Sequence, residues 1–229
     1  MANIVELHGV ELKPVVELEP FTFSKKTRTS PLRSVREMPD EWDHYWRESL
    51  ADSGITEINP IFSGSWYLAT DELSEAQLEK YLSVILDEWG GLSSLDDPDS
   101  VPVLDGGLVL YSKDDGMIVL PTCCSDLGNI ADWKAAVTFK DDYWEMLWIG
   151  HPWLSMKFRK PWLLLSELHE LNNPVERWAV KPDELGHAVS AAEDELSRFS
   201  KMIASVLVNW GYKGDAVGMS LKLVGLGNE

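Results

Sequence analysis

Residues 144–166 read WEMLWIGHPWLSMKFRKPWLLLS, and this stretch decides the fold class. It contains three apolar runs that are each short enough to form a buried strand. The runs are residues 144–149, 153–158 and 162–166. Gly150 and Pro152 interrupt the chain after the first run, and Pro161 interrupts it after the second. Because Gly and Pro mark the turns between strands, this spacing predicts an antiparallel meander.

A second pair of strands is predicted upstream of the meander. Two short apolar runs, residues 108–111 and 117–120, flank a polar segment that ends in Asp115 and Gly116. Asp and Gly tolerate the positive φ angles that tight hairpin turns require. We therefore expect a β-hairpin here, which adds to the antiparallel character of the fold.

Two amphipathic helices are predicted, at about 74–89 and 182–210. In the first, Ser74 and Gln77 have the spacing of a capping box, and Gly90 follows the last apolar position, where it would end the helix. The apolar residues of this helix recur at helical spacing and form one face. They are Leu78, Tyr81, Leu82, Ile85, Leu86 and Trp89. Strands and helices together predict an α+β fold, with a mainly antiparallel sheet flanked by amphipathic helices.

The length of 229 residues fits a single α+β domain over residues 1–229. Residues 24–37 hold five of the twenty basic residues without hydrophobic periodicity. They are predicted to form a basic loop or linker that lies against the protein's own acidic surface. Residues 212–229 are predicted to be a C-terminal extension with one short strand-like run at 221–224.

The formal net charge is −18, because 38 Asp and Glu outnumber 20 Lys and Arg. This charge opposes binding to nucleic acids and to anionic membranes, since both need cationic side chains. It favours fast, salt-sensitive association with a basic protein partner. The N-terminus lacks the basic and apolar regions of a signal peptide, and no apolar run approaches the length of a membrane span. A cytoplasmic protein is therefore expected.

Clustered acids and aromatic rings are the candidate partner-binding residues. The turn-rich segment 93–106 and the predicted hairpin tip both carry Asp side chains that suit a basic partner. Tryptophan is enriched at protein interfaces, and six of the eleven Trp residues lie within 133–178. Most of these rings are expected in the core, with one or two exposed. The candidates are Asp96, Asp97, Asp99, Asp114, Asp115, Trp153 and Trp162.

An alternative pocket is predicted around Cys123, Cys124 and His151, with tryptophan rings as walls. The adjacent cysteines are compatible with metal ligands, with a vicinal disulfide or with a nucleophile. Adjacent ligands strain tetrahedral zinc geometry, so no metal site is predicted. The pattern favours a buried pair of small side chains at a strand-to-loop turn. The chain has no glycine-rich phosphate-binding motif and no hydrolase nucleophile motif, and no cofactor is predicted.

Several short motifs between residues 106 and 170 occur in a recognisable order. Gly106-Gly107-Leu108 opens the hairpin, residues 121–128 read PTCCSDLG, residues 147–153 read LWIGHPW, and residues 165–170 read LSELHE. This order of helix, hairpin and strands resembles the SUKH superfamily of Smi/Knr-type proteins, many of which are bacterial immunity proteins that neutralise toxins. The resemblance implies an α+β fold without catalysis whose acidic face binds a toxin.

Two functions are consistent with the sequence. The first is a non-catalytic acidic interaction protein, of the immunity or antitoxin type, that neutralises a basic toxin. The alternative is a small enzyme or ligand-binding protein with its pocket near Cys123, Cys124 and His151. The missing catalytic motifs favour the first function, and the sequence leaves the oligomeric state open.

Overall fold

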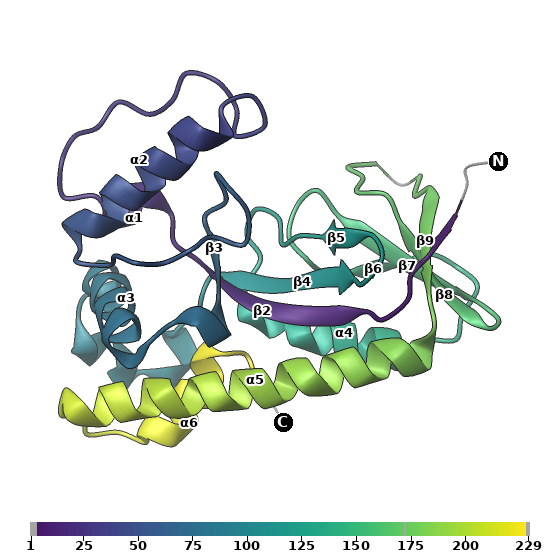
Figure 1. Cartoon of the computed structure of the whole chain (residues 1–229). Coiled ribbons are helices and arrows are strands. Elements are labelled where there is room, and N and C mark those ends of the chain that lie inside the picture. Colours follow the sequence, from purple (N-terminus) through teal and green to yellow (C-terminus); the bar gives the residue numbers. More distant parts are fainter. Residues whose placement is uncertain (1–3, 172, 228–229) are drawn as a thin grey trace.

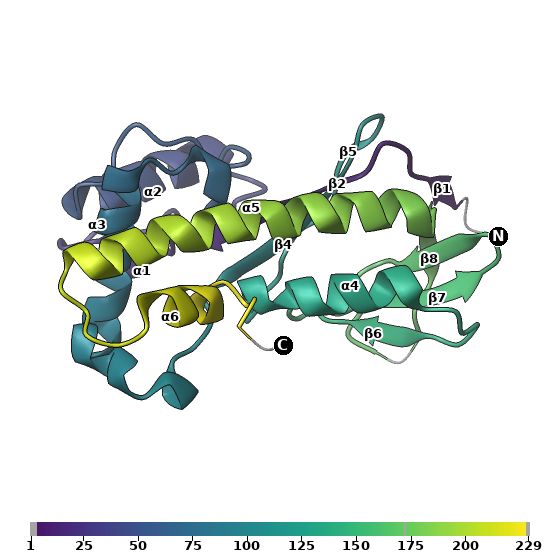
Figure 2. The same ribbon diagram turned by 90° about the horizontal axis from the view of Figure 1, so that it is seen from below.

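The computed structural model of the chain describes residues 4–171 and 173–227. Its helices and two sheets confirm the α+β fold that the sequence predicts (Figure 1). The smaller sheet lies between helices α1 to α3 on one side and the larger sheet on the other. A long helix, α5, runs along the smaller sheet and ends at the edge of the larger sheet (Figure 2).

The smaller sheet has four antiparallel strands in the order β3-β2-β4-β5. These strands are β2 (Glu11–Glu17), β3 (Tyr67–Ala69), β4 (Gly106–Ser112) and β5 (Gly116–Val119). The last two form the predicted hairpin. Gly106 is required where β4 begins its pairing with β2, because a Cβ atom there would lie 2.0 Å from the carbonyl oxygen of Val15.

The larger sheet has five strands in the order β1-β9-β8-β7-β6. They are β1 (Val5–Glu6), β6 (Glu145–Leu147), β7 (Leu154–Arg159), β8 (Trp162–Ser166) and β9 (Glu176–Val180). Strands β6, β7 and β8 pair in antiparallel fashion and confirm the predicted meander. The sequence did not predict β9, nor the parallel pairing of β1 with β9 that adds an N-terminal strand to this sheet.

The α-helices are α1 (Pro20–Phe23), α2 (Pro39–Asp52), α3 (Glu75–Trp89), α4 (Ile130–Thr138), α5 (Pro182–Asn209) and α6 (Ala216–Leu223). Short 3-10 helices cover Thr70–Glu72, Leu92–Asp96, Pro98–Ser100 and Leu127–Asn129. Both predicted amphipathic helices are confirmed as α3 and α5. The capping box of α3 is formed by Ser74 and Gln77, and Gly90 ends the helix with φ 101°. None of the helices within the described residues is long and apolar enough to span a lipid bilayer.

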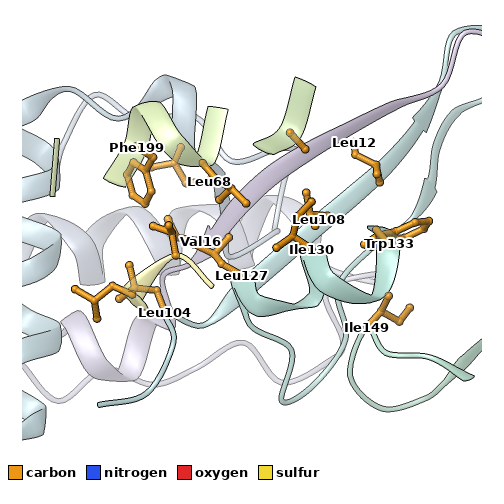
Figure 3. Close-up of a cluster of buried hydrophobic side chains, with 14 of the residues drawn as sticks. Leu12, Val16, Leu68, Leu104, Leu108, Leu127, Ile130, Trp133, Ile149 and Phe199 are labelled. Carbon is orange, nitrogen blue, oxygen red and sulfur yellow. The ribbon is translucent and has the colours of Figure 1, made fainter. Parts of the chain in front are cut away.

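One hydrophobic core joins the two sheets. Helix α5 packs against β2, α3, α4 and α6, and its Phe199 is fully buried. Figure 3 shows Phe199 close to Val16 and Leu68 of the smaller sheet, whereas Trp133 of α4 lies near Ile149 of the loop that follows β6. Buried apolar side chains of the two sheets therefore form one continuous core, and no polar layer separates them within the described part of the chain.

The C-terminal segment corrects one prediction. Residues 221–224 were expected as a strand, but Leu221 to Leu223 lie in α6. The side chain of Asp215 caps this helix by accepting hydrogen bonds from the backbone N–H groups of Val217 and Gly218. A buried apolar face at helical spacing then packs α6 against α5, so the helical period, not the strand period, describes this run.

Residues 24–37 form neither a helix nor a strand. Two of their basic side chains contact the protein's own acids on α2. Arg28 pairs with Asp52, and Lys26 lies 3.2 Å from the same carboxylate. These contacts hold the pKa of Asp52 well below its usual range, mainly through the hydrogen bond from Arg28.

Candidate functional site

The five candidate acids all lie at the surface, in two separate places. Asp96, Asp97 and Asp99 are exposed within the 3-10 turns that follow α3. Asp114 and Asp115 are exposed in the turn between β4 and β5. The segment after α3 and the β4–β5 hairpin lie at different ends of the smaller sheet in both views (Figures 1 and 2). The structure therefore does not gather these acids into one patch.

Trp153 and Trp162 are half-buried rather than fully exposed. The Trp153 ring lies edge-on between the rings of His151 and His169, with centroid distances of 5.2 and 6.2 Å. The Trp162 ring has the ammonium group of Lys181 5.6 Å from its centroid. Both rings thus have contacts within the protein on the larger sheet, away from the acidic turn after α3 (Figure 1).

A cavity of about 440 Å³ opens where β2 ends and β4 begins. Four carboxylates line it, and none of the described residues in its lining is basic. These carboxylates belong to Glu17, Glu19, Glu88 and Asp105. Backbone contacts hold two of them together, because the N–H of Glu17 donates to the carbonyl of Asp105 at 2.9 Å. We call this space the acidic cavity.

Glu17 is the most perturbed carboxylate of the acidic cavity. Burial, together with the negative charges of Asp105 and Glu19, raises its pKa from 4.5 to about 7. Partial desolvation and the carboxylates of Asp126 and Glu88 also raise the pKa of Asp105. The mutual repulsion of these groups means that a cation bound among them would relieve an existing electrostatic cost.

Aromatic side chains form most of the apolar part of the same lining. Phe23, Trp66 and Tyr67 line the cavity, and the Tyr67 hydroxyl donates to the carbonyl of Pro121 at 3.2 Å. The indole N–H of Trp66 is buried and has no hydrogen-bond partner within the described chain. Carboxylates beside aromatic faces are the surroundings that suit a cation on an apolar stem, such as a Lys or Arg side chain.

The cysteines also line the acidic cavity, which corrects the prediction of a buried pair. Cys123 and Cys124 are exposed, and their Sγ atoms lie 3.3 Å apart. The backbone of Cys123 pairs with that of His151, whose N–H donates to the Cys123 carbonyl at 2.9 Å. The backbones of the three residues of the alternative pocket therefore lie next to one another. The His151 ring is not part of the cavity lining and packs against Trp153.

Ser155 and His169 form a contact that the sequence did not predict. Nδ1 of His169 lies 2.7 Å from the carbonyl oxygen of Leu171, which only accepts, so Nδ1 carries the proton. Nε2 then accepts from the Ser155 hydroxyl at 2.9 Å. This is the hydrogen-bond order of an activated nucleophile. Ser155 is only 5% exposed, however, and neither residue lines the acidic cavity, so the contact ties His169 and Leu171 to β7.

The acidic cavity could not be found from sequence spacing. Its lining comes from β2, α1, β3, α3 and the turn before α4, and these segments meet only in the folded chain. Glu17 is an ordinary strand-end glutamate in the sequence. No group of three or more His, Cys, Asp or Glu side chains within residues 4–171 and 173–227 is arranged to hold a metal ion.

Comparison with known proteins gives no relative: no family model, no curated protein and no solved structure matches the chain.

Proposed function

We propose that this chain is a non-catalytic acidic protein that binds a basic protein partner, and that its acidic cavity receives a Lys or Arg side chain of that partner. The observation that carries the proposal is the lining of the cavity. Four carboxylates and three aromatic rings surround about 440 Å³, and the lining residues include no cation to neutralise them.

The charge of the whole chain supports the same function. A net charge of −18 attracts a basic partner over a distance and accelerates association, whereas the cavity would fix the position of one cationic side chain. The exposed acids Asp96, Asp97 and Asp99 are suited to the first role, because they face solvent and are not part of the cavity lining.

The resemblance to SUKH-type immunity proteins adds a class of partner to this proposal. A toxin that acts on nucleic acid needs a cationic surface, because it must bind phosphates. Such a surface would be complementary to this chain. An immunity or antitoxin role, in which binding covers the toxin's basic surface, is therefore the form of the proposal that we favour.

The proposal is tested by calorimetric titration with a short synthetic peptide of alternating Arg and Gly at low salt. The double variant Glu17→Gln, Asp105→Asn should bind the peptide about tenfold more weakly, a loss of about 1.4 kcal/mol. The matched control is Glu145→Gln, Asp194→Asn, which removes the same number of carboxylates from exposed positions outside the cavity, and both variants are titrated at pH 8. The control should bind like the unchanged protein. Equal losses in the two variants would show general charge attraction and would overturn the role of the cavity.

Stopped-flow mixing with the same peptide tests whether the acidic turn after α3 accelerates association. Neutralising Asp96, Asp97 and Asp99 together should lower the association rate at low salt and have little effect at high salt, since salt screens exposed charges. An association rate that does not change would remove this turn from the interface.

A second candidate function is a small enzyme or ligand-binding protein that uses Cys123, Cys124 and His151. The backbone pairing of Cys123 with His151 and the position of both thiols in the cavity lining favour it. This function predicts that a free cationic ligand, for which agmatine is the probe, binds more tightly than the peptide. Loss of that binding in Cys124→Ser or His151→Ala, with the fold intact, would favour it over the first.

A further inference from the structure

Two thiols are held side by side at the acidic cavity. Cys123 and Cys124 are adjacent in sequence, both are exposed, and their Sγ atoms lie 3.3 Å apart. Consecutive side chains of an extended strand point to opposite sides. Here Cys124 has φ 67°, in the left-handed region that few residues other than glycine adopt. This backbone conformation breaks the alternation of a strand and is what allows the two thiols to meet.

The turn that carries the thiols is fixed by its neighbours. The backbone N–H and the hydroxyl of Thr122 both donate to the carbonyl of Ile149, at 2.8 and 2.9 Å. The backbone N–H of His151 donates to the Cys123 carbonyl at 2.9 Å. Gly150 packs so closely that a Cβ atom would lie 2.5 Å from the carbonyl oxygens of Thr122 and Cys123. The juxtaposition of the thiols is therefore built into the fold and does not depend on a free loop.

We infer that Cys123 and Cys124 are a redox-active dithiol, which a small disulfide such as oxidised glutathione converts to a vicinal disulfide at the rim of the acidic cavity. One protein thiolate attacks a sulfur of the small disulfide, forms a mixed disulfide and releases one reduced thiol. The second protein thiolate then attacks the mixed disulfide and expels the other small thiol. The protein loses two electrons and two protons, and the small disulfide takes them up as two thiols.

The geometry of the vicinal disulfide makes its formation reversible. Consecutive Cα atoms lie about 3.8 Å apart, which is shorter than the roughly 4.4 Å lower limit for ordinary disulfides. A disulfide between neighbours is therefore strained, and strained exposed disulfides are easily reduced. Such a bond suits a switch rather than a structural cross-link.

The surroundings of the thiols set the pH at which they react. The hydrogen bond with Cys124, the charge of that neighbour and the carboxylate of Glu17 raise the pKa of the Cys123 thiol. Because the thiolate is the nucleophile, exchange should be slow at neutral pH and faster in alkaline buffer. The groups facing the pair from the cavity lining are Glu17, Glu19, Glu88, Asp105 and Tyr67, and none is cationic.

Oxidation would also change the cavity, and this consequence rests on the proposed function. Closing the S–S bond draws together two side chains of the lining and removes both thiol hydrogens. We expect the oxidised protein to bind the Arg-Gly peptide with an affinity that differs from that of the reduced protein by more than twofold.

Thiol counting tests the inference directly, because the chain contains only these two cysteines. The full-length protein is incubated in alkaline buffer with excess oxidised glutathione until the reaction is complete, alkylated with iodoacetamide and weighed by intact mass spectrometry. The expected product is a monomer that has lost two hydrogens, carries no glutathione and no alkyl group, and regains both thiols with dithiothreitol. A stable mixed disulfide with glutathione, two alkylated thiols or a cross-linked dimer would each overturn the inference.

Two single variants provide the control. Cys123→Ser and Cys124→Ser lack the resolving thiol, so each should accumulate the glutathione adduct that the unchanged protein resolves. If the unchanged protein accumulates the adduct to the same extent as these variants, the two thiols do not act as a pair. Thiol counting does not involve peptide binding. The redox result can therefore be interpreted even if the proposed function is wrong. The peptide titration can likewise be interpreted even if the two cysteines do not form a disulfide.

Discussion

At the scale of single residues, Glu17 has the most clearly shifted pKa among the carboxylates of the acidic cavity. Its pKa of about 7 lies above the ordinary 4.5, so the folded protein binds this proton more tightly than the unfolded chain does. Between these two values the folded state holds more protons, and stability therefore falls as the pH rises through this window. Above pH 7 the ionised Glu17 imposes its full cost, because burial removes it from water and its neighbours Asp105 and Glu19 repel it.

Replacing this carboxylate should therefore stabilise the protein in a pH-dependent way. Glu17→Gln resembles the protonated side chain, so we expect a higher free energy of unfolding than the unchanged protein at pH 8 and little difference at pH 4. Urea denaturation at the two pH values measures this. The control Glu11→Gln, an exposed carboxylate on the same strand, should change stability little at either pH. A Glu17→Gln variant that is less stable at pH 8 would contradict the electrostatic cost.

The cysteine pair shows why single residues are hard to place from the sequence. Free cysteines are usually buried, and this general tendency predicts a buried pair. Cys123 and Cys124 are exposed because the left-handed conformation of Cys124 turns the chain at the edge of a cavity. The sequence contains no glycine or asparagine at this position to indicate such a turn.

At the scale of secondary structure, helix α3 is the element whose ends the sequence predicts most clearly. The Ser74 hydroxyl accepts from the N–H of Gln77 at 3.3 Å, and the Gln77 side chain accepts from the N–H of Ser74 at 3.0 Å. This reciprocal cap satisfies backbone donors that have no partner within the helix. Because α3 also borders the acidic cavity through Ile85 and Glu88, its stability affects the site.

Removal of this cap should destabilise the fold measurably. Ser74→Ala is expected to lower the free energy of unfolding by about 1 kcal/mol. Ser83→Ala is the matched control, since it makes the same chemical change on the exposed face of the same helix, where alanine is a better helix former. Chemical denaturation measures both. Equal stabilities of the two variants would mean that the capping box does not contribute.

Elements with a strong period could be predicted, and those defined by long-range pairing could not. The helices at Glu75–Trp89 and Pro182–Asn209 and the strands of the meander follow from hydrophobic spacing. Strand β9 was not predicted, because Glu176 to Trp178 are only half-buried and do not alternate with buried residues. It pairs with the preceding strand, β8, and on its other side with β1, which lies at the opposite end of the chain.

At the scale of the whole molecule, the same limit explains why the acidic cavity was not predicted. The sequence indicated which residue types a basic partner needs, but its candidate acids lie in turns at separate ends of the smaller sheet. The carboxylates that do meet, among them Glu17 and Asp105, are distant in sequence and are joined by the pairing of β2 with β4. Composition therefore leads only to the proposal of a basic partner, and the fold alone defines the cavity in which a cation would bind.

The continuous core makes a prediction about unfolding. Residues of both sheets belong to one cluster, and α5 spans it with Phe199 fully buried beside the smaller sheet (Figure 3). The two sheets should therefore unfold together, in one transition that has the same midpoint by tryptophan fluorescence and by circular dichroism. Phe199→Ala should lower the free energy of unfolding by about 3 to 5 kcal/mol and keep a single transition.

Val208→Ala is the matched control for this variant, because Val208 is 61% exposed on the same helix. It should change stability by less than about 0.5 kcal/mol. Two separate transitions, with Phe199→Ala shifting only one of them, would contradict a shared core. They would mean that the larger sheet folds independently of the smaller sheet and of α5, and the acidic cavity would then depend on the folding unit that contains the smaller sheet.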